Sequence, residues 1–543
     1  MAEPSSEPPQ RHIFVAREQQ GFIVTDGGAD TALTAESFTR WVAEQESTRP
    51  RWVWGDTAEI YPALLRAGVR VDRAHDLRLC RTILQLAVPD ETWADPVWGA
   101  PTVDQDVSAL FTWSDAPITR PQGLDEVAAE WRHQQRVLAR TQDPGRMRLL
   151  LAAESAGGLI AAEMHHSGVP WSRAIHEQIL TDTLGERRGG VPARMTELAT
   201  AVRRELGDPT VNLDSQQKLL KALRQAGINA TSTSRWELRE HDHPAIAPLI
   251  EYRKLSRLLT ANGWAWLDDW VHDGRFRPVY VPGGVVTGRW ASSGGGALQI
   301  PRLLRPAVHA DPGWRIVSAD VAQLEPRVLA AMSRDERMAE AAAGQDLYEG
   351  IVASGAVAER HEAKIAVLGA MYGATTGDAG RLVPRLRKVF PRAMHLVDEA
   401  ARIGEEGGTV RTWLGRTSPA PSERWFGVQA GASRSADAER VARRWARDQG
   451  RFTRNFVVQG TAAEWALAWM AELRLALRRA QGPDRPELVF FLHDEVLIHA
   501  PEELAGECAM LLQEAADAAG RLLFGAFPID FRLDVHVASD AAK

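Results

Sequence analysis

The stretch WRIVSADVAQLEPRVLAAMS, residues 314–333, decides the fold class because its pattern changes within a few residues. WRIVSAD is typical of a buried strand, and it ends at Asp320. VAQLEPRVLAAMS then begins a helix. The sequence therefore predicts a carboxylate at the point where a strand gives way to a helix.

A second acidic strand end is expected further along the chain. The segments LVFFL (488–492) and VLIHA (496–500) are apolar, and a three-residue turn separates them. That turn consists of His493, Asp494 and Glu495. Carboxylates at the ends of neighbouring strands suit a two-Mg²⁺ site, because ions about 3.5–4 Å apart share acidic oxygens. Asp and Glu are also common turn residues, so either segment alone fits an ordinary turn.

A third stretch, ERHEAKIAVLGAMYG (359–373), predicts a helix with one distinct face. Arg360, Lys364, Leu368 and Tyr372 recur at every fourth position and form a single stripe. Two cations suit a triphosphate, and the apolar and aromatic residues beyond them suit a sugar and a base. The same pattern also fits a solvated basic face with a tyrosine directed into the core.

Two further stretches fit a nucleic-acid site but also have simpler explanations. RNFVVQGTAAEWALAWMAELR (454–474) places Gln459 and Gly460 at the start of an apolar helix, which is equally typical of a buried helix. TGRWASSGGGALQIPRLLRP (287–306) is a Gly/Ser loop with several arginines. It suits a phosphate backbone or an ordinary flexible connection.

The remaining patterns predict a helix-rich α+β protein. Residues 1–10 are rich in Pro, Ser and Glu and are expected to be disordered. Residues 11–120 alternate short apolar runs with amphipathic stretches, as in a small α/β unit, and 88–121 has the composition of a linker. Helical patterns cover 124–262, 328–480 and about 502–522, and further short strands are expected at 277–283 and 531–538.

Composition excludes several classes of protein. The chain has 543 residues, 45% hydrophobic and 25% charged, which is near the globular average and leaves room for several domains. No window approaches the roughly 18 uninterrupted apolar residues of a membrane span, and no secretory signal is evident. Cys80 and Cys508 are the only cysteines, which excludes a disulfide scaffold or a Cys-rich zinc site.

The net charge of −7 is unevenly distributed. Residues 1–120 hold 18 acidic and 11 basic residues, whereas the rest of the chain holds 53 of each. Basic residues concentrate in 381–392, with five Lys/Arg and no acid, and in 434–454, with seven Arg and three acids. Such patches suit phosphate binding even though the whole chain is acidic.

In their order and spacing, these stretches resemble the family A DNA polymerases, the bacterial DNA polymerase I class. SADVAQLEPRVLAAMS is similar to that family's motif A, RHEAKIAVLGAMYG to motif B and HDEV to motif C. QGTAAE and TGRWASS…LQIP are similar to two further signatures, and VNLDSQQKLLKAL, TSTS and HPAIAPLIEYRKLSRLL to the thumb region. The resemblance covers about 146–543 and implies a right-hand polymerase of palm, fingers and thumb.

The resemblance also implies roles for individual residues. Asp320 and Asp494 are expected to bind two catalytic Mg²⁺ ions, for which Mn²⁺ is an expected substitute, with the Val321 carbonyl as a ligand and Glu495 as a supporting carboxylate. The expected nucleotide-binding residues are Arg360, Lys364, Leu368, Tyr372, Glu325, Gln323 and Tyr348, with Lys364 also catalytic. The expected DNA contacts are Arg289, Gln299, Asn455, Gln459, Arg451, Arg257 and, at the primer terminus, His493.

Within this set, Arg360 and Lys364 are expected to hold the triphosphate, and Tyr372 to close over the templating position. Glu325 matches the family's steric gate, a carboxylate at the place of a ribose 2′-hydroxyl, which implies a deoxy-selective pocket.

The sequence departs from the family pattern at several of these positions. Leu368 stands where the family has an aromatic platform beside the nascent base pair, and stacking of this kind is worth roughly 1–3 kcal/mol per base. We therefore expect weaker nucleotide binding or altered discrimination of analogues. Val321 replaces a tyrosine, Pro326 a leucine, and Tyr348 a histidine that usually binds phosphate. These changes are expected to affect the efficiency and fidelity of DNA synthesis, but not the type of reaction that is catalysed.

The N-terminal region is expected to be a degenerate RNase H-like 3′→5′ exonuclease domain. An active domain needs a D-x-E on its first strand and two further Asp, because it uses two metals. GFIVTDGGAD, assigned to the first strand, offers only Asp26 and Asp30. Asp76 falls outside the usual metal set, and the segment near 126–134 lacks the expected Asp. We therefore expect no proofreading, and the length leaves no room for a 5′ nuclease domain.

The predicted boundaries are 1–10 for a disordered N-terminus, 11–143 for the exonuclease-like domain and 144–543 for the polymerase domain. Within the latter, the thumb is expected at about 205–262, the fingers at about 331–454, and the palm in the remainder.

The leading hypothesis is a template-directed DNA polymerase for repair or gap filling. It is expected to act as a cytoplasmic, nucleoid-associated monomer on primer-template DNA and dNTPs, with no membrane partner. Two alternatives stay open: a bifunctional polymerase with an active 3′→5′ exonuclease, and a DNA-binding repair accessory whose polymerase site has decayed.

Overall fold

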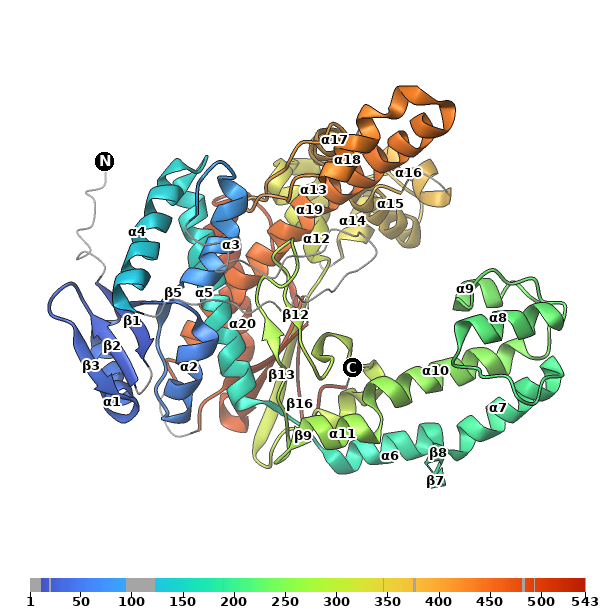
Figure 1. The fold of residues 1–543 in the computed structure, drawn as a ribbon, viewed down its shortest axis with the longest axis horizontal. Coiled ribbons are helices and arrows are strands. Elements are labelled where there is room, and N and C mark those ends of the chain that lie inside the picture. Colours follow the sequence, from blue (N-terminus) through green and yellow to red (C-terminus); the bar gives the residue numbers. More distant parts are fainter. Residues whose placement is uncertain are drawn as a thin grey trace. The chain divides into compact units, whose positions relative to one another are not determined.

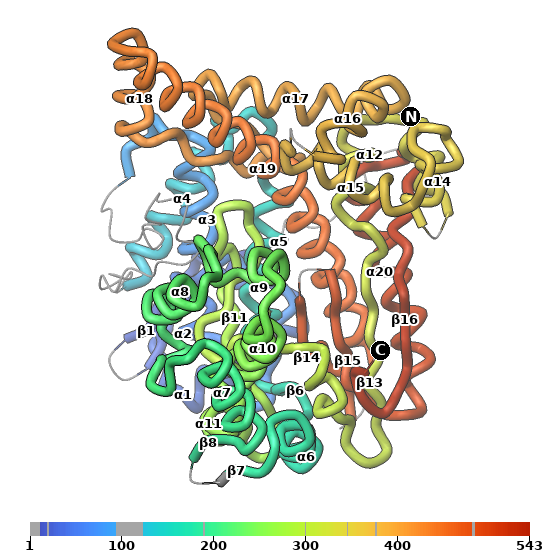
Figure 2. The backbone as a smooth tube through the Cα atoms, turned by 90° about the vertical axis from the view of Figure 1, so that its right-hand side faces the viewer, coloured from blue at the N-terminus to red at the C-terminus, as the bar shows by residue number. Residues whose placement is uncertain are grey.

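The computed structural model describes residues 11–18, 21–93, 123–188, 190–344, 346–374, 377–480, 484–492 and 494–542 (Figures 1 and 2). The expectations for residues 1–10, for most of the 88–121 linker and for His493 lie outside these residues. The chain forms two compact units, each described here by itself. The first combines Met1–Ser167, Val279–Ser293 and Val317–Val537, and the second combines Gly168–Pro278, Gly294–Ile316 and Ala538–Lys543.

The first unit begins with a five-stranded sheet of order β3-β2-β1-β4-β5. β1, β4 and β5 are parallel, whereas β2 and β3 extend the sheet in antiparallel fashion. Trp52 and Trp54 of β4 are fully buried and fill the core between the sheet and its helices. The strands are β1 (His12–Glu18), β2 (Gly21–Thr25), β3 (Thr31–Thr34), β4 (Arg51–Trp54) and β5 (Arg73–Asp76).

Four helices accompany this sheet, and three of them start at a capping side chain. Thr34, Asp56 and Asp76 each accept a hydrogen bond from a backbone N–H of the first helical turn. The small α/β unit predicted from the sequence is therefore present. The helices are α1 (Ala35–Gln45), α2 (Thr57–Arg66), α3 (Leu77–Ala87) and α4 (Leu124–Arg140), with a short η1 (Glu46–Thr48) after α1.

The assignment of GFIVTDGGAD to the first strand was wrong. The first strand is HIFVARE, and GFIVT forms β2, because the apolar run at 12–16 pairs in parallel with β4. Asp26 and Asp30 lie in the exposed turn between β2 and β3. Asp26 forms an ion pair with Arg11 at 2.7 Å. The corrected first strand, β1, also contains no D-x-E motif.

A four-stranded sheet of order β14-β15-β13-β16 carries the two predicted acidic strand ends. The β14–β15 hairpin is antiparallel, with Leu492 opposite Glu495. The expected strand at 277–283 shrinks to the two-residue β11, because Pro282 and the following glycines interrupt pairing. The strands of this sheet are β13 (Trp314–Val321), β14 (Glu487–Leu492), β15 (Glu495–Pro501) and β16 (Leu533–Ala538). β11 (Tyr280–Val281) and β12 (Ala291–Ser292) form a separate two-stranded sheet.

Three long helices belong to the same unit as this sheet. α19 has 42 residues, and Trp465 and Trp469 in its C-terminal half are fully buried. It packs against both α5 and α20. The helices are α5 (Pro144–Ser167), α19 (Ala436–Leu477) and α20 (Ala505–Phe524), with η6 (Glu502–Leu504) before α20.

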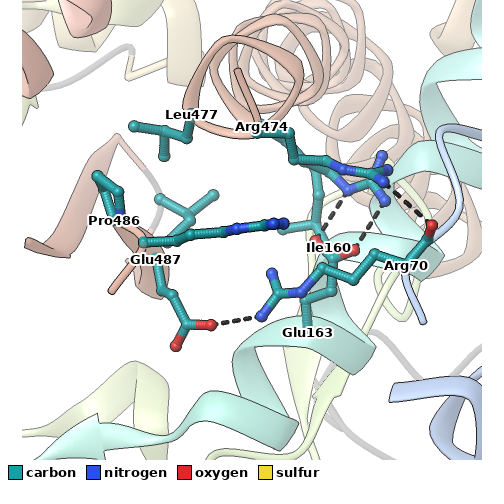
Figure 3. Close-up of a pocket in the computed structure, with 10 residues that line it drawn as sticks. Arg70, Ile160, Glu163, Arg474, Leu477, Pro486 and Glu487 are labelled. Atoms are coloured by element: carbon teal, nitrogen blue, oxygen red, sulfur yellow. Dashed lines mark hydrogen bonds and ion pairs between the residues drawn. The ribbon is translucent and has the colours of Figure 1, made fainter. Parts of the chain in front are cut away.

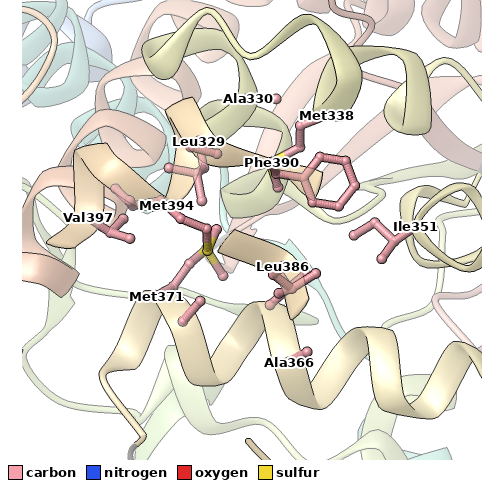
Figure 4. Packing of buried hydrophobic residues seen from close by; sticks show 14 of the residues in the cluster. Leu329, Ala330, Met338, Ile351, Ala366, Met371, Leu386, Phe390, Met394 and Val397 are labelled. Carbon is pink, nitrogen blue, oxygen red and sulfur yellow. The ribbon is translucent and has the colours of Figure 1, made fainter. Parts of the chain in front are cut away.

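The region between β13 and α19 is helical, as predicted for 328–480, and has its own core (Figure 4). Met371 of α15, Leu386 of α16 and Met394 of α17 are buried together, so α15 presents its other face to solvent. The helices are α12 (Leu324–Ser333), α13 (Glu336–Ala342), α14 (Leu347–Ala353), α15 (Arg360–Tyr372), α16 (Gly377–Val389), α17 (Pro391–Glu405) and α18 (Glu423–Ala430), with η5 (Ala432–Arg434) after α18.

The second unit is mainly helical and includes residues 205–262, for which a thumb was predicted. Leu219, Leu249 and Leu255 belong to its buried core. Its helices are α6 (Arg173–Leu184), α7 (Ala193–Leu206), α8 (Gln216–Gln225), α9 (Arg235–Leu238), α10 (Ile246–Asn262), α11 (Trp264–Trp270), η3 (Ala297–Gln299) and η4 (Arg302–Ala307). Its short strands are β6 (Val169–Pro170), β7 (Arg187–Arg188), β8 (Val191–Pro192), β9 (Val271–His272) and β10 (Arg275–Phe276).

The predicted α+β class is therefore confirmed. Within the described residues, no helix has the length and apolar character needed to cross a membrane.

A buried ion pair joins the N-terminal sheet region to the long helices (Figure 3). Arg474 of α19 donates to both carboxylate oxygens of Glu163 on α5, at 2.7 and 2.8 Å. Tyr61 of α2 donates to the same carboxylate at 2.5 Å. Arg474 also donates to the carbonyls of Val71 and Asp72. Burial opposes the charge of Glu163, but Arg474 outweighs it and holds the pKa of Glu163 below its ordinary value.

Two further ion pairs lie beside this pair. Arg70 forms an ion pair with Glu487 at the start of β14, and Arg478 forms one with Asp72 at 2.6 Å. Three segments distant in sequence therefore meet around Arg474.

Replacing Arg474 with Met is expected to lower the free energy of unfolding by about 3–5 kcal/mol, because Glu163 would remain as a buried unpaired charge. Thermal unfolding and urea titration measure the change. The matched control is Arg479→Met, an exposed arginine nearby, with an expected effect within about 0.5 kcal/mol. Adding Glu163→Gln to Arg474→Met should recover part of the loss, since the amide still accepts from Tyr61. Equal effects of the two arginine substitutions would contradict this account.

Candidate active site

Asp320 and Asp494 are brought together by the pairing of their strands. Asp320 is the penultimate residue of β13, and Asp494 directly precedes β15. β13 and β15 are neighbours in the sheet, and the Val321 N–H donates to the Asp494 carbonyl at 3.0 Å. Glu495 follows within the hairpin and is only 3% exposed. The sequence-based prediction of two acidic ends on neighbouring strands therefore corresponds to the observed arrangement.

The electrostatics of Asp494 reflect this proximity. Burial, and then the neighbouring Asp320 carboxylate, raise the pKa of Asp494 to about 6. Mutual repulsion between two partly buried carboxylates favours a divalent cation between them, and carboxylate oxygen is the ligand that Mg²⁺ prefers. The donor set therefore fits such an ion. Within the described residues, no group of three or more His, Cys, Asp or Glu side chains is placed so that it could hold a metal ion.

The turn that follows Asp320 has an uncommon backbone conformation. Gln323, the N-cap of α12, has φ of 50°, which is unusual for a residue with a side chain. Its side-chain oxygen accepts a hydrogen bond from the Leu347 N–H at 3.2 Å and so ties the turn to the start of α14. Gln323, predicted to bind nucleotide, thus also holds this turn in place.

The predicted stripe lies on the solvent side of α15. Arg360, Lys364 and Tyr372 are exposed, and Leu368 is half-buried against the helical core. Lys364 makes no ion pair with any residue in the described part of the chain. Exposure of these side chains is compatible with nucleotide binding and with a solvated basic face, so the predicted role of the stripe stays a prediction.

Arg360 has a protein partner at the start of α14. Its guanidinium contacts the Asp346 carboxylate at 2.6 Å and lies over the Tyr348 ring, 5.7 Å from the ring centre. Burial raises the pKa of Tyr348 to about 12, so its phenol stays protonated. Asp346 was not singled out from the sequence, although its place immediately before a helix is typical of an N-cap.

The C-terminal end of the stripe connects directly to α12. The Tyr372 hydroxyl donates to Glu325 Oε2 at 2.6 Å, and Arg289 forms an ion pair with the other carboxylate oxygen. Burial, and then this hydrogen bond, raise the pKa of Tyr372, so the phenol remains the donor. Glu325 lies five residues after Asp320, and its contacts with Tyr372 and Arg289 fix the orientation of its carboxylate.

α19 approaches the same region at the predicted QGTAAE signature. The Thr287 hydroxyl lies 2.9 Å from Gln459 Oε1. A Cβ at Gly460 would lie 2.4 Å from Thr412 Cγ2 and 3.1 Å from the Thr287 carbonyl oxygen, so the close approach requires glycine. Asn455 is half-exposed and Arg451 exposed on the same helix.

Three of the residues predicted to contact DNA are not part of the group of contacts around Asp320, Asp494 and Glu325. His493 lies outside the described residues. Arg257, exposed on α10, and Gln299, in η3, belong to the second unit. Their roles stay predictions.

No role was assigned to Arg327 from the sequence, but its side chain stabilises the backbone next to the site. It is fully buried and donates to the carbonyls of Ala322, Ala342, Gly344 and Asp530, at 2.6–3.0 Å. A charged residue within the apolar helix 324–333 is a signal of such a satisfied buried group.

The N-terminal carboxylates are arranged differently from the Asp320–Asp494 pair. Asp56 caps α2 and forms an ion pair with Arg78 at 2.8 Å. Asp76 is fully buried and accepts from the backbone N–H groups of Thr57 and Leu79, at 2.8 and 2.9 Å. Burial, and then Asp56, raise the pKa of Asp76 to about 6. Helix caps and an arginine thus occupy oxygens that a metal would need.

Comparison with known proteins identifies relatives for most of the chain. Residues 181–541 match the sequence profile of DNA polymerase family A. DNA polymerase I of Chloroflexus aurantiacus is 30% identical over 386 residues, covering 63% of this chain and 38% of that protein. DNA polymerase I of Geobacillus stearothermophilus is 25% identical over 558 residues, covering 93% of this chain and 60% of that protein. The chain spans less than two thirds of the length of these curated relatives.

A solved structure has a similar fold. The POL domain of Pol1 from M. smegmatis, in complex with DNA primer-template and dNTP, superposes with a TM-score of 0.72, covering 98% of this chain and 96% of that one. At 19% sequence identity this likeness concerns the fold alone. Taken with the profile match over residues 181–541, the chain belongs to DNA polymerase family A.

Proposed function

We propose that the chain is a template-directed DNA polymerase that adds dNTPs to a primer 3′ end, in repair or gap filling and without proofreading. The observation that carries the proposal is the Asp320–Asp494 pair, which lies in the same compact unit as the stripe of α15. The Tyr372–Glu325 hydrogen bond connects the two. The primer-template and dNTP in the structurally similar M. smegmatis protein support DNA and dNTP as partners.

Asp320, Asp494 and the Val321 carbonyl would hold two Mg²⁺ ions. When bound, Mg²⁺ supplies Lewis acidity to the attacking 3′-hydroxyl and to the leaving pyrophosphate. The protein contributes position: β13 and β15 fix the two carboxylates before substrate arrives, so little reorganisation is needed during the reaction.

The stripe of α15 orients the nucleotide. Lys364 and Arg360 would hold the triphosphate at the N-terminal half of the helix, which directs the base towards Tyr372. Because Arg360 is paired with Asp346 in the absence of nucleotide, triphosphate binding would compete with that carboxylate. Tyr348, protonated and beside Arg360, would donate a hydrogen bond to a phosphate oxygen.

Glu325 would exclude ribonucleotides because its carboxylate is held in place by Tyr372 and Arg289. Arg289 contacts Glu325, and Gln459 contacts Thr287, two residues before Arg289. The residues that would contact DNA are Arg289, Gln459, Asn455, Arg451, Gln299, Arg257 and His493. The absence of proofreading is supported by Asp56 and Asp76, whose oxygens are engaged by Arg78 and by helix N-termini.

Asp494→Ala is expected to reduce primer extension by about a thousandfold or more, since several kcal/mol of transition-state stabilisation would be lost. Extension of a labelled primer on a primed template with Mg²⁺ measures this. The matched control is Asp517→Ala, an exposed carboxylate of α20, which should extend like the wild type. Failure of the wild type on several primed templates, with Mg²⁺ and with Mn²⁺, would favour the accessory alternative.

The same assay with a mismatched 3′ end reports on proofreading. We expect no shortening of the mismatched primer. Shortening that disappears with Asp56→Ala and Asp76→Ala, while extension persists, would instead establish the bifunctional alternative.

Glu325→Ala is expected to raise ribonucleotide incorporation relative to dNTP incorporation by about tenfold or more, since removing the carboxylate opens the space for a 2′-hydroxyl. Single-nucleotide insertion with rNTP and dNTP gives the ratio. Tyr372→Phe removes one of the two contacts that hold the Glu325 carboxylate, so its ratio is expected to lie between those of the wild type and Glu325→Ala. A ratio unchanged in Glu325→Ala would rule out the gate.

Leu368→Phe is expected to lower the KM for dNTP or to change discrimination against dideoxynucleotides, because a ring restores stacking worth roughly 1–3 kcal/mol. Steady-state insertion kinetics with both nucleotide types measure the effect. Identical constants in the wild type and in Leu368→Phe would show that this position does not contact the nascent base pair.

A further inference from the structure

A buried ion pair packs against the loop that carries Arg289. Arg416 donates to Glu154 Oε2 of α5 at 2.5 Å, and the two side chains are only 7% and 1% exposed. Each member of such a pair holds the other in place, because the loss of either leaves a costly unpaired charge in the interior. Both residues belong to the same compact unit as Asp320 and Asp494.

The loop that joins β11 to β12, residues 282–290, lies directly against both members of the pair. A Cβ at Gly283 would lie 2.6 Å from Glu154 Oε1, and a Cβ at Gly288 would lie 2.5 Å from Arg416 Nε. Both glycines have positive φ, at 62° and 86°. At these two positions the loop therefore needs glycine both for its backbone conformation and for its contact with the ion pair.

Hydrogen bonds inside loop 282–290 connect Gly288 to its neighbours. The Gly288 N–H donates to the Val285 carbonyl at 2.8 Å, and the Val285 N–H donates to the Arg289 carbonyl at 3.1 Å. The backbone at Arg289 is thus set by these hydrogen bonds and by the Arg416 guanidinium against Gly288. A displacement of Gly288 would therefore also move Arg289.

The turn that contains Arg416 is fixed by α19. The Thr412 hydroxyl and the Leu414 N–H both donate to the buried carboxylate of Glu464, the latter at 2.9 Å. The Thr412 N–H donates to the Arg416 carbonyl at 2.9 Å and closes the turn. α19 therefore positions the backbone of Arg416, while Glu154 of α5 positions its guanidinium.

Arg289 connects loop 282–290 to the carboxylate of Glu325. Its guanidinium forms an ion pair with Glu325 Oε1, and the Tyr372 hydroxyl donates to Oε2 at 2.6 Å. The Arg289 side chain is 28% exposed, so burial alone does not fix it. Its grip on Glu325 therefore depends on where the loop places its backbone.

We propose that Arg416, held by Glu154, is a positioning residue for sugar selection, which sets the place of Arg289 and through it the orientation of the Glu325 carboxylate. This inference rests on the proposed function, in which Glu325 excludes ribonucleotides. Within the described residues, Arg416 Nε makes no hydrogen bond. Its contact with Gly288 is thus one of packing, for which the flat guanidinium is suited and the ammonium of lysine is not.

The test compares Arg416→Lys and Arg416→Met with Arg474→Met, all in the full chain. Lysine keeps a charge for Glu154 but lacks the planar group that packs on Gly288, and methionine loses both. Arg474→Met is the matched control, because it also removes a buried arginine from an ion pair but one whose partner is Glu163. Single-nucleotide insertion gives the ratio of kcat/KM for rNTP to that for dNTP. Hydrogen exchange of the amides of residues 283–289 is measured without substrate.

Both Arg416 variants should raise the rNTP to dNTP ratio by about threefold to tenfold, because Tyr372 alone then holds the carboxylate. Amide exchange in residues 283–289 should become about tenfold faster. Arg474→Met should lower the melting temperature at least as much as Arg416→Lys but leave the ratio and the exchange of this loop unchanged. In an Arg289→Met background, Arg416→Lys should raise the ratio no further, since its effect passes through Arg289.

An unchanged ratio in both Arg416 variants would overturn the proposal. So would an equal change in Arg474→Met, or a full additional effect of Arg416→Lys in the Arg289→Met background. Loop exchange that stays at the wild-type rate in both variants would also overturn it. Absence of dNTP insertion by the wild type would contradict the proposed function, whereas the loop exchange tests separately whether Arg416 fixes the backbone at Arg289.

Discussion

The backbone hydrogen bond from Val321 to the Asp494 carbonyl is the contact on which the site depends, because it holds two carboxylates at adjacent ends of β13 and β15, the two central strands of the sheet. This juxtaposition is unfavourable by itself, as the raised pKa of Asp494 indicates. The surrounding structure therefore has to hold it. Arg327, fully buried and bonded to four carbonyls, and Gln323, with its positive φ, both stabilise the turn immediately after Asp320.

α19 extends this constraint over a long distance. Its C-terminal half is buried beside the sheet and is anchored by the Arg474–Glu163 pair, its middle meets the 287 loop at Gly460, and its N-terminal half carries exposed arginines. A single helix therefore links the packing of the sheet to the position of its exposed N-terminal half beside α15 and α17. Arg454, bonded to both Ala370 and Asp398, connects α19 to α15 and α17.

Much of this arrangement could be predicted from sequence where a local pattern carries the information. The strand ending at Asp320, the hairpin at 488–500 and the four-residue spacing of the α15 stripe are short-range signals, and all three correspond to the structure. The partners of these residues could not be predicted in the same way. Asp346 meets Arg360, and Arg289 meets Glu325, through folding of segments 14 and 36 residues apart, for which no periodicity exists. The misassigned first strand has a similar cause, since HIFVARE and GFIVT are both apolar and only pairing with β4 distinguishes them.

The N-terminal sheet region has a structural role that is visible in its polar contacts. Its acidic residues cap helices or pair with arginines, and the polar network around Glu163 makes its sheet region part of the support for α19. Removing this domain would leave Arg474 and Glu163 without Tyr61 and without the carbonyls of Val71 and Asp72, which is costly for buried charges. The N-terminal sheet region therefore contributes to the structural support of α19.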